Sequence, residues 1–139
     1  MGNFVRASKY RKNYEQKEDL SNVSEENKKK FEALDKSLFN EKQLSQIEIG
    51  FKRNLDFSKY ADPKYNHSQM FELRIALQYS DNLKPEDLDF LFDNKWNNEQ
   101  MRELRLGMLA GIDYSIFADT DYNSTIMRNV RIDLENSES

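Results

Sequence analysis

The chain has 139 residues and a formal net charge of −4, and 33% of its residues are charged. This length predicts one domain with a modest core, and the absence of cysteine excludes a disulfide framework and thiolate metal sites and favours a reducing cytoplasm. With only four Gly and two Pro, the chain has too few turn residues for a β-sandwich.

Residues 1–23 are predicted to be a flexible basic arm. Residues 1–30 carry eight Lys or Arg and five acidic residues, a net charge of +3, whereas the remainder carries −7. The aromatic residues Phe4, Tyr10 and Tyr14 are interspersed among the basic residues Arg6, Lys9, Arg11 and Lys12. Basic groups of this kind neutralise phosphates and aromatic rings stack on unpaired bases, so the arm could contact nucleic acid. The alternative interpretation is a solvated arm without a ligand.

The next segment, residues 24–39, predicts a helix. Phe31, Leu34 and Leu38 follow the i, i+3, i+7 spacing of one helical face. Ser24 or Asn27 could provide its N-cap. This helix begins a single all-α domain that we expect to cover residues 24–139.

Four similar segments follow, which we call the four copies. They begin with an aromatic residue and Asn at 39–40, 65–66, 96–97 and 122–123, so the Asn residues are 26, 31 and 26 positions apart. Asn is a strong N-cap, and the Gln three residues later in the first three copies completes a capping box. The aromatic residue and the Leu or Met four residues after Asn form a hydrophobic staple. Each copy is therefore predicted to begin a helix.

These helices carry one broad apolar face. In the third copy Met101, Leu104, Leu106 and Met108 follow helical spacing, and the other copies match it. A small residue ten positions after Asn would let a neighbouring backbone approach; the four residues there are Gly50, Ala76, Gly107 and Asp133. The Asp in the last copy predicts that its helix is exposed at this position.

A shorter unit follows each of the first three helices. Asp56, Asp87 and Asp113 are predicted to cap these short helices. Pro85 is suited to an early helical position and Gly111 to the residue after a helix C-terminus.

Together these elements predict an all-α fold, a small helical-repeat array of alternating longer and short helices. The expected repeats cover residues near 39–64, 65–95 and 96–121, with a partial repeat at 122–135.

Arg74, Arg105 and Arg131 occupy one register, eight residues after Asn. A row of arginines could bind phosphates or an acidic partner. The alternative is a packing role, in which the aliphatic stems are buried and the guanidinium groups pair with Glu72, Glu103 or carboxylates of the next unit.

Residues typical of catalysis or metal binding are scarce. The chain has no Cys and one His, His67, which we interpret as a surface residue. The aspartates at 81–93 and 119–121 are interpreted as helix caps and solvated faces, although carboxylates alone could hold Mg²⁺ or Ca²⁺. No nucleotide-binding or hydrolase motif occurs. We therefore expect no cofactor, no metal and no enzymatic activity.

The third copy, QMRELRLGM…GIDYSIFADTDYN, resembles a short tandem helical repeat of the type QMxEIRxGL…GxDVSxYAxPxYN. That repeat occurs in proteins from phages and mobile elements of Gram-positive bacteria. The resemblance covers residues 39–135, but the first copy has Glu48 where the repeat has Arg, and the second lacks the Gly-containing turn. The resemblance implies an interaction module. Its setting suggests an inhibitor of a bacterial defence nuclease, such as an anti-CRISPR protein.

We therefore expect a cytoplasmic, non-enzymatic module that binds a protein, such as a nucleic-acid-handling host enzyme or ribonucleoprotein. No segment is long and apolar enough for a membrane span of about 18 residues, and the N-terminal sequence lacks the apolar stretch of a signal peptide. The alternative is a nucleic-acid-binding accessory protein that uses the basic arm and the arginine row.

Overall fold

The computed structural model describes residues 19–93 and 95–138. All regular structure in these residues is helical, so the predicted all-α class is confirmed. The α-helices are α2 (Glu25–Ala33), α3 (Glu41–Lys52), α4 (His67–Gln78), α5 (Pro85–Leu91), α6 (Asn98–Ala110) and α7 (Ser124–Glu138). The short 3₁₀ helices are η1 (Lys36–Leu38), η2 (Phe57–Lys59), η3 (Ser80–Asn82) and η4 (Tyr114–Ile116).

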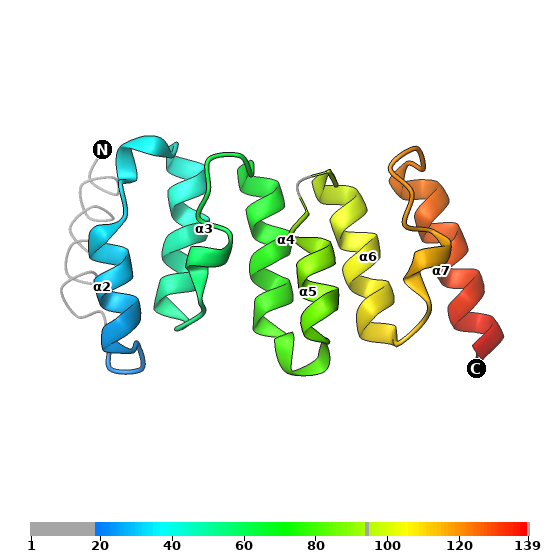
Figure 1. Ribbon diagram of the computed structural model, residues 1–139, viewed down its shortest axis with the longest axis horizontal. Coiled ribbons are helices and arrows are strands. Elements are labelled where there is room, and N and C mark those ends of the chain that lie inside the picture. Colours follow the sequence, from blue (N-terminus) through cyan, green and yellow to red (C-terminus); the bar gives the residue numbers. More distant parts are fainter. Residues whose placement is uncertain (1–18, 94, 139) are drawn as a thin grey trace, which may run out of the picture.

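The helices of the four copies, α3, α4, α6 and α7, lie side by side and run in the same direction (Figure 1). We call them the long helices. Helices α2 and α5 run the opposite way, and α5 contacts both α4 and α6. The 3₁₀ helices η2 and η4 contact α3 and α6, the long helices that precede them. The chain thus alternates between a layer of long helices and a thinner layer of short elements.

The predicted capping boxes are present in the first three copies. Asn66 Oδ1 accepts a hydrogen bond from the backbone N–H of Gln69 at 2.8 Å, and Gln69 Oε1 accepts one from Asn66 N–H at 2.9 Å. The same reciprocal pair starts α3 and α6. In the fourth copy Asn123 accepts from the N–H of Ile126, and the box is incomplete as expected.

The capping Gln also joins neighbouring long helices, which the sequence did not predict. Its Nε2 donates to the backbone carbonyl of the aromatic residue that precedes the next long helix. The pairs are Gln43 with Tyr65, Gln69 with Trp96 and Gln100 with Tyr122, at 2.7, 2.8 and 2.9 Å. One amide therefore satisfies a helix N-terminus and fixes the start of its neighbour. Within the described residues no helix follows α7, and Ile126 at the equivalent position is 42% exposed.

The core lies between the two layers and is rich in aromatic rings. The position ten residues after Asn is small because a ring from the following short element fills the space. A Cβ on Gly107 would lie 2.7 Å from Cζ of Phe117, and one on Gly50 would collide with the Tyr60 hydroxyl. The expectation that a neighbouring backbone approaches here is therefore wrong. Asp133 is exposed, as predicted.

The predicted helix over 24–39 is interrupted. Ser24 caps α2 as expected, but the backbone leaves the helical region at Leu34. Asp35 then accepts a hydrogen bond from the Ser37 N–H and starts η1. Because the helical register is lost here, Leu38 does not share the face of Phe31 and is 57% exposed.

The short units differ from the prediction in their caps. Asp113 caps η4 through the Ser115 N–H, but Asp56 makes no backbone cap bond. Asp87 is not the cap of α5: Lys84 holds that place and Pro85 is the first helical residue. The middle unit is five residues longer than the other two, and it alone forms an α-helix. Gly111 has the expected left-handed conformation, with φ of 73°.

Candidate interaction surface

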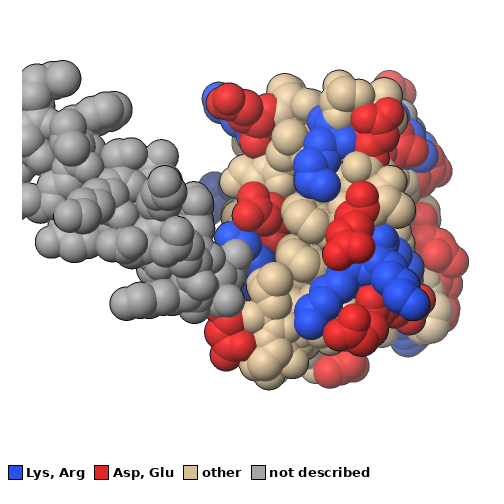
Figure 2. All heavy atoms as spheres, turned by 90° about the vertical axis from the view of Figure 1, so that its left-hand side faces the viewer, with Lys and Arg blue, Asp and Glu red and all other residues tan. Residues whose placement is uncertain are grey.

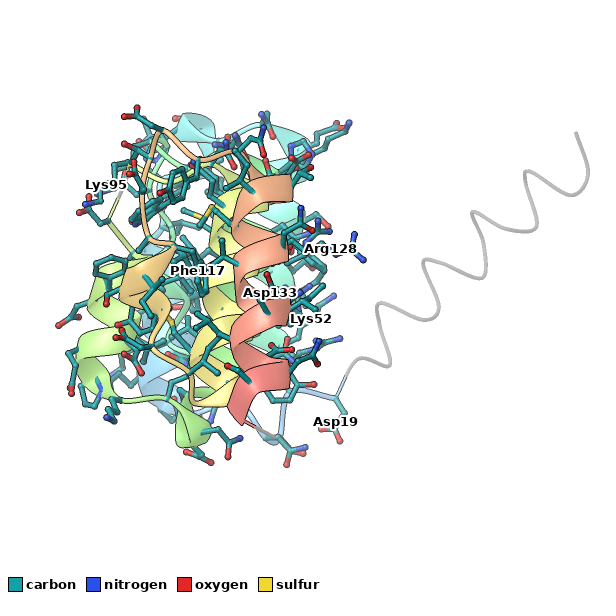
Figure 3. All side chains as sticks on the ribbon, turned by 90° about the vertical axis from the view of Figure 1, so that its right-hand side faces the viewer. Asp19, Lys52, Lys95, Phe117, Arg128 and Asp133 are labelled. Atoms are coloured by element: carbon teal, nitrogen blue, oxygen red, sulfur yellow. The ribbon has the colours of Figure 1, made fainter. Side chains whose placement is uncertain are left out.

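The long helices present one face that the short elements do not cover, and we call it the long-helix face. Seen from the α7 end, the short elements and Phe117 lie on one side, and Arg128 and Lys52 point away on the other (Figure 3). Each long helix contributes residues of the same registers to this face, because the four helices are parallel and begin with the same cap.

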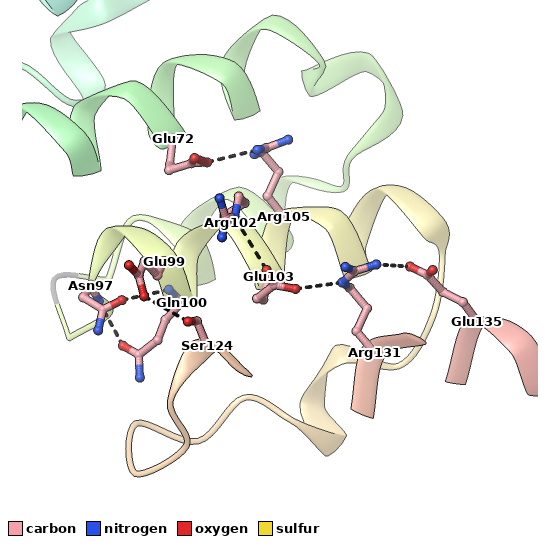
Figure 4. Close-up of polar contacts among 10 residues, drawn as sticks. All are labelled: Glu72, Asn97, Glu99, Gln100, Arg102, Glu103, Arg105, Ser124, Arg131 and Glu135. Atoms are coloured by element: carbon pink, nitrogen blue, oxygen red, sulfur yellow. Dashed lines mark hydrogen bonds and ion pairs between the residues drawn. The ribbon is translucent and has the colours of Figure 1, made fainter. Parts of the chain in front are cut away.

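The arginine row joins each long helix to the one before it. The pairs are Arg74 Nε with Gln46 Oε1, Arg105 Nη2 with Glu72 Oε2 and Arg131 Nε with Glu103 Oε1, each at 3.0 Å. Figure 4 shows the second and third of these pairs. Their acceptors also share one register, six residues after Asn. Glu72 and Glu103 are the partners that the packing interpretation named, but they belong to the preceding unit rather than the next.

Burial makes these bonds important for the fold. The side chain of Glu103 is 2% exposed and that of Arg131 12%. Burial lowers the pKa of Arg131, but hydrogen bonds to Glu135 and Glu103 outweigh it, so the pKa lies above its usual value. A buried ion pair is strongly destabilising when one partner is removed, because the other charge then lacks compensation.

Arg74 is the member of the row whose positive charge is least compensated by hydrogen-bond partners. It is 4% exposed, and its acceptors are the amide oxygens of Gln46 and Gln78 rather than carboxylates. Its guanidinium also lies over the ring of Phe71, 5.2 Å from the centroid. Burial, followed by the nearby charge of Arg53, lowers the pKa of Arg74. The three predicted arginines are thus engaged in bonds between helices, and their role in partner binding stays a prediction.

A second pair of arginines flanks a groove between α6 and α7. Arg102 and Arg128 lie on either side, and the groove of about 290 Å³ is also lined by Glu103, Leu106 and Arg131. Arg102 makes one long contact, 3.6 Å from Nε to the Glu103 carboxylate. Arg128 is exposed, and the described part of the chain gives it no carboxylate partner.

Phe71 stands beside a hollow on the same face. Phe71 is 42% exposed. The other residues that line the hollow are Gln46, His67, Ser68, Glu72 and Asn98. His67 is half-buried here rather than fully solvated. An exposed aromatic ring beside a concave, partly polar surface is typical of an interface anchor.

Aspartate side chains gather on the short elements and the connecting segments. Ten of the twelve aspartates lie between residues 35 and 121 outside the long helices. Several accept hydrogen bonds in turns, as Asp62 does from the Lys64 N–H and Asp119 from the Asp121 N–H. Among the residues described, no group of three His, Asp or Glu is placed to hold a metal ion.

The α2 end of the molecule has charges of both signs. Lys and Arg alternate with Asp and Glu over this surface (Figure 2). Lys28 pairs with Glu25, and Lys30 with Glu26 and Asp56. The described residues of this end therefore form no patch of a single sign.

Of the predicted site residues, the structure describes the three arginines of the row but not the four basic residues of the arm. Arg74, Arg105 and Arg131 lie together on the long-helix face, whereas the arm residues Arg6, Lys9, Arg11 and Lys12 lie outside the described residues. Sequence reasoning missed Phe71, Arg102 and Arg128, which all lie five residues after Asn. The available signal was that this register holds Ser, Phe or Arg in different copies, whereas the preceding register is always Leu or Met.

Comparison with protein-family models, curated proteins and solved structures finds no match to this chain. None of the described helices has the length and apolar character needed to cross a membrane.

Proposed function

We propose that the protein is a non-enzymatic module that binds another protein through the long-helix face. The observation that carries this proposal is Phe71, a large aromatic residue that is 42% exposed beside a hollow between long helices. The other copies place Ser45, Arg102 and Arg128 at this register, so helix packing does not require an aromatic ring there. Aromatic residues dominate the binding free energy of many protein interfaces.

The finer proposal is an inhibitor, from a phage or mobile element, that blocks a bacterial defence nuclease such as a CRISPR effector. It is supported by the sequence resemblance of residues 39–135 and by the surface just described. The expectation of no enzymatic activity continues to rest on the absence of Cys and the single His in the sequence. A cytoplasmic location belongs to the same proposal.

Nucleic-acid binding by the arginine row has less support. Arg105 and Arg131 are paired with buried carboxylates, which offset their charge toward an approaching phosphate. The basic arm is the remaining candidate for that function.

The test is capture of a partner by the immobilised full chain from a nuclease-treated bacterial lysate, followed by identification of the protein. A purified partner nuclease is then assayed for DNA cleavage with and without the chain. Phe71→Ala is expected to weaken the purified complex about tenfold or more. Ile126→Ala is the matched control, because Ile126 is also 42% exposed but lies on α7 away from the hollow.

Three results would count against the proposal. They are equal binding by Phe71→Ala and the wild-type chain, absence of any protein partner, or retention of the pure chain on nucleic acid at physiological salt. If that retention is lost on deletion of residues 1–20, the alternative function of the basic arm is supported instead.

A further inference from the structure

Three residues at one register form a row across the long-helix face. Phe71 lies on α4, Arg102 on α6 and Arg128 on α7, each five residues after the capping Asn. The helices are neighbours in that order. The row therefore runs from an aromatic ring on α4 to guanidinium groups on α6 and α7.

The arginines of this row are not used in packing. The side-chain bonds that join α6 to α7 and to the residue before its cap are made by Glu99 with Ser124, Glu103 with Arg131 and Gln100 with Tyr122. The side chain of Arg102 is 52% exposed. The first two copies have no cation at this register. An exposed arginine on each side of the same groove is therefore unexplained by the fold.

The charged groups of the groove lie at different depths below the surface. The carboxylate of Glu103 is 2% exposed and is bound by Arg131, whereas Arg102 and Arg128 reach the surface. Among the residues that line the groove, the outermost groups are therefore cationic and the carboxylate lies beneath them. Leu106 adds an apolar patch to the lining. Guanidinium groups at the mouth of such a groove can donate paired hydrogen bonds to a planar oxyanion.

We infer that this groove binds the carboxylates of an acidic segment of the protein partner. The inference rests on the proposed function and names the chemistry of the partner at that site. Neighbouring helix axes are about 8–10 Å apart. An extended chain advances about 3.3 Å per residue. A segment that crosses the row would thus place an apolar residue on Phe71 and acidic residues about three and six positions away.

A protein segment fits better than a nucleic acid. Two exposed arginines neutralise few phosphates, and the affinity of a nucleic acid depends on the number of phosphates neutralised. Residues 31–139 carry a net charge of −7, which repels a long polyanion more than a short acidic segment.

The test uses the full chain, labelled with ¹⁵N, at physiological ionic strength. The probes are a peptide of about ten residues that contains one Phe followed by Asp and Glu, its Asn/Gln counterpart, a single-stranded oligonucleotide of the same length, and inorganic phosphate. The acidic peptide is expected to shift the Nε–Hε signals of Arg102 and Arg128. The double variant Arg102→Gln/Arg128→Gln is expected to bind it about tenfold more weakly or worse.

The charge-matched control is Lys29→Gln/Lys42→Gln, which removes two exposed cations elsewhere and should leave binding nearly unchanged. The inference is overturned if both double variants weaken binding equally, if the Asn/Gln peptide binds as tightly, or if the oligonucleotide or phosphate binds more tightly than the acidic peptide. Capture of a partner that is insensitive to Arg102→Gln/Arg128→Gln but sensitive to Phe71→Ala would reject this inference alone. Loss of any partner would instead reject the proposed function.

Discussion

Arg131 Nε lies 3.0 Å from Glu103 Oε1 and joins α7 to α6. Arg105 joins α6 to α4 at the equivalent place, through Glu72. The same kind of Arg–Glu ion pair therefore links two successive pairs of long helices. In both ion pairs the carboxylate is the more deeply buried partner.

Replacement of Glu103 should be costly. We expect Glu103→Ala to lower the free energy of unfolding by about 2–3 kcal/mol, slightly below the usual loss for a broken buried pair. The reason is that Arg131 loses its buried partner but keeps Glu135. Urea denaturation followed by circular dichroism measures the change. Glu135→Ala is the control: its side chain is 33% exposed, and its loss should cost less than about 1 kcal/mol. Equal losses in the two variants would contradict the assigned importance of burial.

The two functions of the capping Gln can be separated at Gln69. Gln69→Ala removes the bonds to Asn66 N–H and to the Trp96 carbonyl, and we expect it to cost about 2 kcal/mol. Gln69→Glu keeps the capping acceptor but, when ionised, cannot donate to Trp96. The free energy of unfolding of Gln69→Glu should therefore be much lower than that of the wild type at neutral pH. The difference should be smaller once the carboxyl is protonated, and chemical denaturation at two pH values would detect this.

Ile126→Gln is the complementary variant in α7. The new amide can accept a hydrogen bond from Asn123 N–H and complete the fourth capping box. Within the described residues no long helix follows α7, so its Nε2 has no equivalent backbone carbonyl to donate to. We expect a gain of about 0.5–1 kcal/mol in the free energy of unfolding. A loss of stability would show that the box alone does not favour this helix start.

Gly107 should tolerate no side chain. Its missing Cβ leaves room for the ring of Phe117, which is fully buried. Overpacking costs about 1–3 kcal/mol, against a gain of about 1 kcal/mol for Ala over Gly in a helix. We expect Gly107→Ala to lower the melting temperature, and to be neutral or stabilising when combined with Phe117→Leu. The same effect of Gly107→Ala in both backgrounds would contradict the steric explanation.

Stability should decrease in strongly alkaline solution. Burial raises the pKa of Tyr60, Tyr65 and Tyr114 above the usual 10.0, and the hydrogen bond to Asp87 raises that of Tyr114 further. Each tyrosine thus stabilises the fold below pH 10, and this contribution is lost as the pH rises toward the higher folded-state pKa, because the unfolded chain ionises first. Tyr114→Phe should make the free energy of unfolding less dependent on pH above 10, measured by denaturation at a series of pH values. An unchanged slope would contradict the assignment to Tyr114.

Local structure was the most predictable part of the molecule. Asn66 and Gln69 are three residues apart, and their box depends on backbone geometry that any helix start provides, so the sequence was sufficient. The break at Leu34 was missed because Asp35 competes locally for the Ser37 N–H, and apolar spacing does not report that competition. The candidate site was only partly predictable: Arg105 was recognised by its register, but its partner Glu72 is 33 residues earlier.

The sequence alone determined the all-α class, the starts of the long helices and the exposed Asp133, because caps and helical spacing are interactions over a few residues. Only the tertiary structure decided that Gln69 reaches the carbonyl of Trp96, that Gly107 makes room for a ring, and that Arg102 and Arg128 flank one groove. These relationships depend on which helices become neighbours and at what height, and that is set by packing of the whole core.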